Sequence, residues 1–374
     1  MFIWLRFTLP QFASYLSSFQ TDPSEQLKII DATLDEPKAN EVLIKMVATG
    51  VCHTDTAGRD GLTTPLPVSL GHEGAGIVEQ VGSSVMDLQP GDHVVLSFAY
   101  CGRCQHCLTG HPGMCEHFNE LNFAGHNFDG SHRIHTLDGQ PISTFFGQSS
   151  FSTHAVVDQH NVIKVDPTVD LRLLGPLGCG IQTGAGTVLN YLQPKFGESL
   201  VIFGTGAVGL SAIMAAKITG ANHIIAIDIF DNRLALAKEL GATEVINSHQ
   251  ADVEATLKEI LPTGADYAID TTGVSPVVMN ALHALKPGGE CAVVGMGRDL
   301  TFNLMNDLMA EGKKILGVIE GDAIPQLFIP KLVDYYKQGR FPFDKLIKFY
   351  DFDQINDGFA ASKDGSVLKP VVTF

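Results

Sequence analysis

Four of the seven cysteines in this 374-residue chain lie close together, with the spacing C-x2-C-x2-C-x7-C. Four thiolates fill the tetrahedral shell of a zinc ion and leave no position for water. The spacing therefore predicts a closed, unreactive structural zinc site. An iron–sulfur cluster is the alternative, because it also suits clustered thiolates. The cysteines concerned are Cys101, Cys104, Cys107 and Cys115.

Three further residues are far apart in the sequence but suit a second, open metal site: Cys52 in GVCHTD, His72 in GHEG and Cys179 in LGCGIQTG. Two thiolates and one imidazole leave a fourth position for water or substrate, and in that arrangement zinc acts as a Lewis acid. Taken singly, each could equally be a buried free cysteine or a satisfied polar histidine. The residue types alone therefore only suggest this site.

A glycine-rich motif predicts a dinucleotide-binding site after an apolar strand at 200–203. The first glycine permits a tight turn, the second lets the backbone approach a pyrophosphate, and the third lets helix and strand pack closely. Asp228 ends the next apolar run, at about the 20-residue offset where a carboxylate binds ribose hydroxyls and repels a 2′-phosphate. We therefore expect NAD rather than NADP, with a mere strand-to-helix turn as the less favoured alternative. The motif reads Gly204-Thr205-Gly206-Ala207-Val208-Gly209.

The length and the pattern of the sequence predict two domains. From about 42 to 165, short apolar runs are broken by Gly, Pro and Asp, which predicts an irregular β domain with Gly82 and Gly91 at positive φ in turns. From about 180, strand-like and helical segments alternate, which predicts βαβ units and a doubly wound α/β domain with a parallel sheet. A closing strand within 368–374 is expected to return to the first domain.

Composition argues against several other classes of protein. Hydrophobic residues make up 45% and charged residues 18% of the chain, a balance typical of globular proteins. The formal charge of -16 disfavours a nucleic-acid partner, and no run reaches the roughly 18 apolar residues of a membrane span. Sparse cysteines indicate a reducing, cytoplasmic compartment. Residues 1–19 are apolar but interrupted, without a cleavage site, so no signal peptide is expected.

The motifs occur in the order found in the zinc-containing medium-chain alcohol dehydrogenases, which this chain resembles from about residue 20 to 374. Within that family the chain looks most like the aryl (benzyl) alcohol dehydrogenases and the geraniol dehydrogenases. Relatives open with a regular strand, which is not evident over residues 1–19 here. The resemblance is carried by GVCHTD, GHEGAGIVEQVG, GDHVVL, the four-cysteine segment, GTGAVGL, FFGQSSF, LGPLGCGIQTGAG and FIPKLVDYYKQGRFPFDKLIKFY.

The resemblance implies an architecture and a metal content. Residues 1–180 and 321–374 would form a GroES-like catalytic domain, and residues 181–320 a Rossmann nucleotide-binding domain. Each subunit would hold NAD and two zinc ions, one catalytic on Cys52, His72 and Cys179 and one structural on the four clustered cysteines. The subunits would form a homodimer or homotetramer built on the nucleotide domains.

The resemblance also implies roles for residues around the catalytic zinc. Glu73 resembles a carboxylate that approaches the metal during ligand exchange, and Asp55 one that orients the histidine ligand. Thr54 matches the hydroxyl that accepts the proton of the alcohol. Many relatives end this proton relay in a histidine where Ala57 stands here. His53 is the nearest titratable alternative, although relatives use a basic residue there to face the pyrophosphate.

Further residues are expected to contact the cofactor. Thr183 matches a residue near the nicotinamide, and Lys369 occupies a position where relatives place a cation on the pyrophosphate. An ordinary surface lysine is the alternative for Lys369. Arg233 and Gly295 complete the expected cofactor contacts.

The substrate is expected to be a small alcohol or aldehyde. Phe98, Phe145 and Phe146 match the pocket region of the family, and aromatic walls suit an aryl or allylic alcohol, with plain core packing as the alternative. Residues 116–120 carry two glutamates where glutathione-dependent relatives carry an arginine, which disfavours a glutathione adduct. The leading hypothesis is NAD-linked, reversible oxidation of primary aromatic or allylic alcohols. A broad aliphatic or hydroxyacid dehydrogenase and a non-catalytic zinc or NAD-binding protein are the alternatives.

Overall fold

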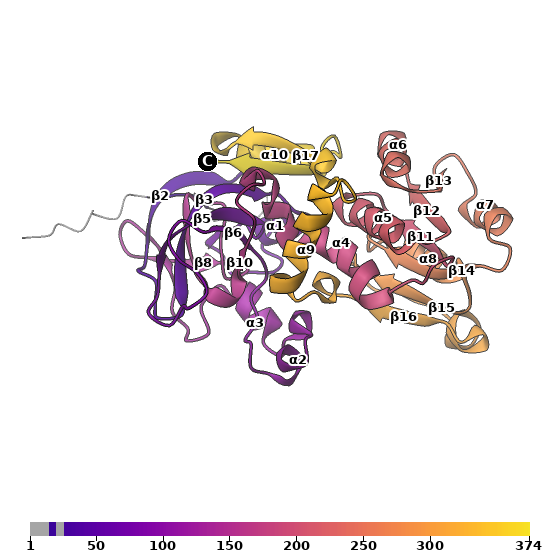
Figure 1. Ribbon diagram of the computed structural model, residues 1–374, viewed down its shortest axis with the longest axis horizontal. Coiled ribbons are helices and arrows are strands. Elements are labelled where there is room, and N and C mark those ends of the chain that lie inside the picture. Colours follow the sequence, from indigo (N-terminus) through magenta and orange to yellow (C-terminus); the bar gives the residue numbers. More distant parts are fainter. Residues whose placement is uncertain (1–14, 20–25) are drawn as a thin grey trace, which may run out of the picture. The chain divides into compact units, whose positions relative to one another are not determined.

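The computed structural model describes residues 15–19 and 26–374, and these residues divide into two compact units (Figure 1). Within the described residues, the first unit runs to residue 102 and adds 116–178 and 347–374, and the second contains 103–115 and 179–346. The division into functional domains at 180 and 321 stays a prediction. None of the helices in the described ranges combines the length and apolar character that a membrane span requires.

The first unit is built from two mainly antiparallel sheets. In the larger one, β3 (Glu41–Gly50) pairs with β5 (Gly74–Val81), β9 (His154–Asp158) and β18 (Lys369–Thr373). Most β3 side chains are buried, which explains its nearly continuous apolar sequence. The pairing of β18 with β3 confirms that the end of the chain returns to this unit. The remaining strands of this sheet are β6 (His93–Leu96), β10 (Val162–Lys164) and β17 (Ile347–Asp351).

The start of the described chain differs from expectation. Residues 15–19 form strand β1 (Tyr15–Phe19), antiparallel to β2 (Lys28–Leu34), although no regular strand was evident there in the sequence. The pairing with β2 satisfies the β1 backbone, which the sequence pattern alone does not reveal. Residues 1–14, where we expected no signal peptide, lie outside the described chain. The same sheet adds β7 (Ile134–Thr136), β8 (Pro141–Thr144) and β4 (Val68–Ser69).

One of the two expected turn glycines adopts positive φ and the other does not. Gly91 has φ +94°, as predicted. Gly82 does not adopt positive φ, so the reason predicted for a glycine at this position was wrong. A Cβ atom on Gly82 would lie 2.0 Å from the carbonyl oxygen of Lys38. Close backbone approach, and not conformation, therefore requires glycine at position 82.

The second unit is the doubly wound domain that the sequence predicts. Its six parallel strands follow the order β13-β12-β11-β14-β15-β16. The order reverses next to β11, which is the switch point where such sheets bind ligands. The strands are β11 (Ser199–Phe203), β12 (His223–Asp228), β13 (Glu244–Asn247), β14 (Ala265–Asp270), β15 (Leu285–Val293) and β16 (Lys314–Gly317).

Helices cover both faces of this sheet. Because βαβ crossovers are right-handed, the reversal of strand order places the first pair of helices and the second pair on opposite faces. The first pair is α5 (Ala207–Thr219) with α6 (Asp231–Leu240), and the second is α7 (Val253–Ile260) with α8 (Ser275–His283). Other helices are α1 (His53–Arg59), α2 (Gln105–Leu108), α3 (Phe118–Phe123), α4 (Gly180–Gly186), α9 (Pro325–Lys337) and α10 (Ile355–Lys363).

Helix α4 packs directly on α5 within the second unit. A Cβ atom on Gly184 of α4 would lie 1.9 Å from the carbonyl oxygen of Val208 in α5. Only glycine permits this approach of two helix backbones. The residue before α4 is Cys179, and α5 begins in the glycine-rich motif. The contact therefore fixes the distance between a predicted metal ligand and the predicted cofactor loop.

Candidate active site

Asp55 organises the first part of the site. Its Oδ1 accepts from the Nδ1 of His72 at 2.9 Å and from the backbone N–H of Gly71 at 3.1 Å. Its Oδ2 accepts from the backbone N–H of Cys52 at 2.9 Å. Asp55 and His72 are fully buried. The structure thus brings Asp55 onto the predicted histidine ligand, as the sequence led us to expect, and fixes Cys52 as the N-cap of α1 at the same time.

The hydrogen bond to Asp55 determines the state of the His72 ring. With Nδ1 bound to the carboxylate, the lone pair of a neutral ring lies on Nε2. That Nε2 is buried and has no hydrogen bond of acceptable geometry. Burial opposes protonation of His72, but Asp55 outweighs burial and raises the pKa of His72 well above its usual value. A metal ion at Nε2 would therefore replace a proton.

The backbone immediately before Cys179 is tightly held. A Cβ atom on Gly178 would lie 1.9 Å from the Leu96 carbonyl oxygen, and the Ser97 hydroxyl donates to the Gly178 carbonyl at 2.7 Å. The ligand atoms of Cys52, His72, Glu73 and Cys179 lie within 4.8 Å of one another. Zinc with bonds of about 2.0–2.3 Å separates its ligand atoms by about 3.3–3.8 Å, so this donor set fits the ion.

Glu73 forms a buried ion pair with Lys369 at 2.8 Å. Burial raises the pKa of Glu73 to about 7, although the Lys369 ammonium acts in the opposite direction. Lys369 is 3% exposed and also donates to the Val51 carbonyl at 3.3 Å, so it is not an ordinary surface lysine. Its contact with a cofactor pyrophosphate stays a prediction. Gly50 makes room for Glu73, because a Cβ atom there would lie 2.0 Å from Glu73 Oε2.

The predicted pocket phenylalanines are buried around the histidine. Phe146 stacks on the His72 ring with centroids 4.5 Å apart, and Phe145 meets it edge-on at 5.5 Å. Together with Phe98 they belong to one hydrophobic cluster, which supports the core-packing alternative. Phe146 holds φ +52°, a conformation that costs of order 1 kcal/mol in a non-glycine residue. Their role as substrate walls stays a prediction.

The remaining residues predicted around the first zinc ligand differ in exposure. Thr54 Oγ1 lies 3.8 Å from Cys52 Sγ, close to the metal-ligand group. His53, the first residue of α1, is exposed. Ala57 lies in the same short helix. A proton path through His53 is therefore open to solvent at that residue.

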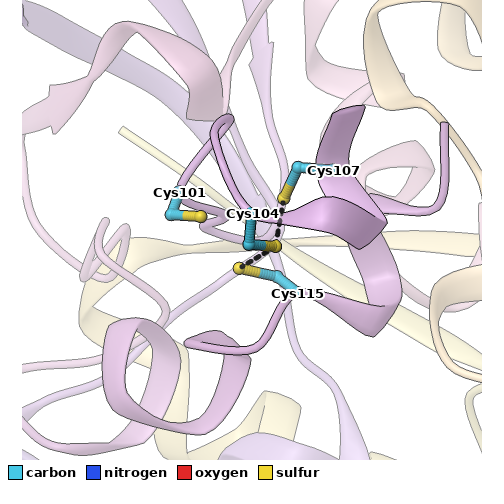
Figure 2. Close-up of side chains that lie close together, drawn as sticks. All are labelled: Cys101, Cys104, Cys107 and Cys115. Atoms are coloured by element: carbon cyan, nitrogen blue, oxygen red, sulfur yellow. Dashed lines mark hydrogen bonds between the residues drawn. The ribbon is translucent and has the colours of Figure 1, made fainter. Parts of the chain in front are cut away.

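The four clustered cysteines converge as a second group (Figure 2). Cys104 Sγ lies 3.5 Å from Cys107 Sγ and 4.0 Å from Cys115 Sγ, and with Cys101 all four sulfurs lie within 4.8 Å. Four thiolates on one zinc ion stand about 3.8 Å apart. An iron–sulfur cluster would separate its thiolates more widely, because several irons and sulfides lie between them. The geometry favours one metal ion.

The glycine-rich motif has the geometry that its sequence predicts. Gly204 adopts φ +89°, and a Cβ atom on Gly209 would lie 1.9 Å from the Gly204 carbonyl oxygen. A Cβ atom on Gly206 would meet no atom within 4 Å, so the space beside this N-cap is open for a ligand. Helix α5, which begins with Ala207 and Val208, has 13 residues and offers unpaired backbone N–H groups at this end.

Asp228 lies at the end of β12, against the glycine-rich loop. Its Oδ2 accepts from the backbone N–H and the hydroxyl of Thr205, at 2.6 and 2.7 Å. Its Oδ1 accepts from the N–H groups of Ile229 and Phe230. These bonds fix the carboxylate at the end of β12, and its contact with a ribose stays a prediction. Arg233 stacks its guanidinium over Phe230, 4.7 Å from the ring centroid.

Two other predicted cofactor residues also occupy defined positions. Gly295 follows β15, and a Cβ atom there would lie 2.3 Å from the Gly273 backbone nitrogen. Thr183 is buried in α4 and donates to Glu320 at 3.3 Å.

Sequence reasoning missed several residues that support the site. Gln148 donates to the carbonyls of His72 and Ser97 at 3.0 and 3.2 Å. Gln148 lies within the family-like segment FFGQSSF, and this position in the sequence could have identified it. Glu320 lies beside Cys179, and only its burial in the folded chain reveals it.

Comparisons with known proteins agree with this geometry. Residues 38–167 match the alcohol dehydrogenase GroES-like domain, and residues 207–335 match the zinc-binding dehydrogenase domain. A geraniol dehydrogenase from Castellaniella defragrans is 45% identical over 353 residues, which are 93% of this chain and 94% of that protein. The chain belongs to the zinc-containing alcohol dehydrogenase family. It is therefore a zinc-dependent oxidoreductase of that family.

Solved structures of other members of the zinc-containing alcohol dehydrogenase family share the fold. Benzyl alcohol dehydrogenase from Acinetobacter calcoaceticus matches with a TM-score of 0.93 and 46% identity, covering 96% of this chain and 99% of that one. An alcohol dehydrogenase zinc-binding domain protein from Burkholderia ambifaria matches with a TM-score of 0.94 and 47% identity over the same shares.

The two cysteine groups are expected to respond differently to loss of one ligand. Cys179→Ser should remove one zinc ion per chain, keep the melting temperature, and reduce alcohol oxidation by about 10³-fold, as expected for several kcal/mol of lost Lewis-acid stabilisation. Cys104→Ser should also remove one zinc but lower the melting temperature, because structural zinc contributes folding energy. Metal analysis and thermal melts check both. Cys291→Ala, at a buried cysteine outside both groups, is the control.

The glycine-rich loop yields a paired prediction. Gly209→Ala should destabilise the protein by about 3 kcal/mol, because its Cβ overlaps a backbone oxygen. Gly206→Ala should fold normally, since its Cβ meets open space, yet weaken NAD binding by about tenfold or more, or 1.4 kcal/mol. Chemical unfolding and NAD titration measure the two effects. Equal NAD affinity in Gly206→Ala and wild type would contradict the placement of the cofactor.

Proposed function

We propose that this dehydrogenase oxidises primary aromatic or allylic alcohols reversibly to aldehydes, with a catalytic zinc on Cys52, His72 and Cys179. The observation that carries the proposal is the buried His72, whose Nδ1 is held by Asp55, whose Nε2 has no hydrogen bond, and which groups with Cys52 and Cys179 as possible metal ligands. When bound, zinc supplies a Lewis acid that acidifies the alcohol, and NAD accepts the hydride.

The chain's own residues orient the reactants and move the proton. Asp55 fixes the tautomer of His72, and Thr54, beside Cys52, accepts the proton of the alcohol. With Ala57 in place of a histidine, the exposed His53 passes the proton to solvent in our proposal. Glu73, held by Lys369, belongs to the same group of possible ligands and would be available to a bound zinc when a water ligand leaves.

NAD is the proposed cofactor. The carboxylate of Asp228 is held beside the open space at Gly206 and would repel a 2′-phosphate. Thr183, Arg233, Gly295 and Lys369 are the further proposed cofactor contacts. The second zinc, on Cys101, Cys104, Cys107 and Cys115, is proposed to be structural. Because none of the seven cysteines, all of which lie in the described ranges, forms a disulfide, we also propose a cytoplasmic location.

The substrate class is supported by two lines of reasoning. Relatives that cover nearly the whole chain are named for geraniol and for benzyl alcohol, an allylic and an aromatic primary alcohol. Phe145 and Phe146 pack on His72 within the buried core cluster, and in our proposal they also line the inner end of the substrate pocket beside that ring. Aromatic rings and allylic chains both gain from such contacts, whereas ethanol is too small to use them.

A panel of alcohols tests the function. Benzyl alcohol and geraniol with NAD should give kcat/KM values at least about tenfold above that for ethanol, since one or two buried carbons contribute 1–3 kcal/mol. Hexanol, a hydroxyacid and hydroxymethylglutathione complete the panel, and NADP replaces NAD in a parallel set. Equal kcat/KM for ethanol and benzyl alcohol would favour a broad aliphatic enzyme. Absence of turnover with every alcohol would contradict the enzyme assignment for this chain.

We further propose a homodimer built through β16. This strand ends the second unit's sheet and pairs only with β15 among the described strands. Nearby, Leu304, Met305 and Met309 are more than half exposed, which is unusual for large apolar side chains grouped together. An edge strand beside an apolar patch is suited to pairing with a second copy of itself.

The mass of the protein in solution tests this interface. Leu304→Glu combined with Met309→Glu should convert the dimer to monomers, because each buried interface would then contain unpaired charges. Light scattering coupled to gel filtration measures the change. Leu62→Glu, at an equally exposed leucine in the first unit, should leave the mass unchanged. A wild-type protein that runs as a monomer would contradict the dimer.

A further inference from the structure

Three consecutive residues at 320–322 adopt the left-handed backbone conformation. The φ values are +50° at Glu320, +66° at Gly321 and +47° at Asp322. Gly321 has a steric reason, since a Cβ atom there would lie 2.5 Å from the Gln182 carbonyl oxygen. Glu320 and Asp322 are strained in this conformation, which glycine adopts without strain. Their side chains must therefore account for their presence.

The side chain of Glu320 is directed at the start of helix α4. Its Oε2 accepts from Gln182 Nε2 at 3.2 Å and from the Thr183 hydroxyl at 3.3 Å. Its Oε1 lies 3.8 Å from Cys179 Sγ. The residue is only 8% exposed. One buried carboxylate thus contacts the proposed zinc ligand and the residue proposed to lie near the nicotinamide.

Asp322 makes a contact of a different kind from the same segment. Its carboxylate accepts from His111 Nδ1 at 2.9 Å. His111 lies between Cys107 and Cys115, in the segment that carries the second cysteine group. A Cβ atom on Gly113 in that segment would lie 2.9 Å from the Ile319 carbonyl oxygen. The Glu320 carboxylate therefore faces Cys179, and the Asp322 carboxylate faces the segment that carries the four cysteines.

We propose that Glu320 is a positioning residue for alcohol oxidation, which holds Cys179 and Thr183 in the geometry that zinc and nicotinamide require. The inference rests on the proposed function, because it concerns the same zinc. Groups that contact a metal ligand set its orientation and its electron donation, and their removal weakens metal binding or activity by about 10–100-fold. A zinc-bound Cys179 has no S–H to donate to Glu320, so the positioning runs through Gln182 and Thr183 in α4, the helix whose N-cap is Cys179. Displacing the carboxylate therefore disturbs the metal ligand and the cofactor contact together.

Two substitutions of Glu320 distinguish the effect of its position from the effect of its charge. In Glu320→Gln the amide oxygen can still accept from Gln182 and Thr183, but an N–H donor now faces the Cys179 sulfur. In Glu320→Asp the charge remains but the shorter side chain falls back from α4. Asp also tolerates the left-handed conformation better than Glu, which favours folding of this variant. We expect both variants to release one zinc to a chelator about tenfold faster than wild type and to lose kcat more than they raise KM for the alcohol.

The spectrum of the cobalt-substituted enzyme provides a readout that a purely structural role would not change. An N–H donor at the Cys179 thiolate should shift its charge-transfer absorption to higher energy in Glu320→Gln. Asp322→Asn is the matched control, because it makes the same chemical change in the same segment but faces His111. It should leave zinc release from the catalytic site and alcohol oxidation unchanged.

The outcomes are separable. Wild-type rates of zinc release and an unshifted cobalt spectrum in both Glu320 variants, with alcohol oxidation intact, would overturn this inference and leave the proposed function standing. If wild-type protein holds no zinc or oxidises no alcohol, the proposed function itself fails. Faster zinc release in Glu320→Gln alone would assign the effect to charge, and so overturn the positioning role.

Discussion

The carboxylate of Asp55 is the interaction on which the metal site depends. It binds the backbone of Cys52, the backbone of Gly71 and the ring of His72 at once. Two ligands that lie twenty residues apart in the sequence are thereby fixed by one buried group. A buried carboxylate is costly unless every acceptor is used, and these three donors satisfy that requirement. Removal of the Asp55 carboxylate would release all three groups at once.

Glycine contacts connect this site to the cofactor loop inside the second unit. Gly184 brings α4 against Val208 of α5, and Gly209 brings α5 against Gly204 at the end of β11. Each contact is between backbone atoms, so it has almost no freedom to adjust. The path from Cys179 to the open space at Gly206 is therefore a chain of rigid contacts. Hydride transfer needs that rigidity, because small misplacements of the reactants greatly lower the rate.

Patterns that are local in sequence predicted much of this structure. The period of apolar residues located β11, β12 and α5, and the motif spacing identified the cysteine group and the glycine loop. Contacts between residues far apart in the sequence could not be predicted in this way. Nothing in the sequence pairs Lys369 with Glu73, or places Glu320 on Cys179, because those pairs are brought together only by tertiary packing. Strand β1 was missed for the same reason, since its partner β2 determines it.

Electrostatics explain why this set of buried residues calls for a cation. Two thiolates and a carboxylate lie within 4.8 Å of one another, and like charges at that distance repel by about 3 kcal/mol per pair at an effective dielectric of about 20. Burial chiefly, and Cys52 to a lesser degree, raise the pKa of Glu73 to about 7 against the opposing effect of the Lys369 ammonium. A divalent ion removes the repulsion and displaces the protons of the thiols and of His72. Zinc affinity must therefore increase with pH through the neutral range, because each displaced proton is released more readily there.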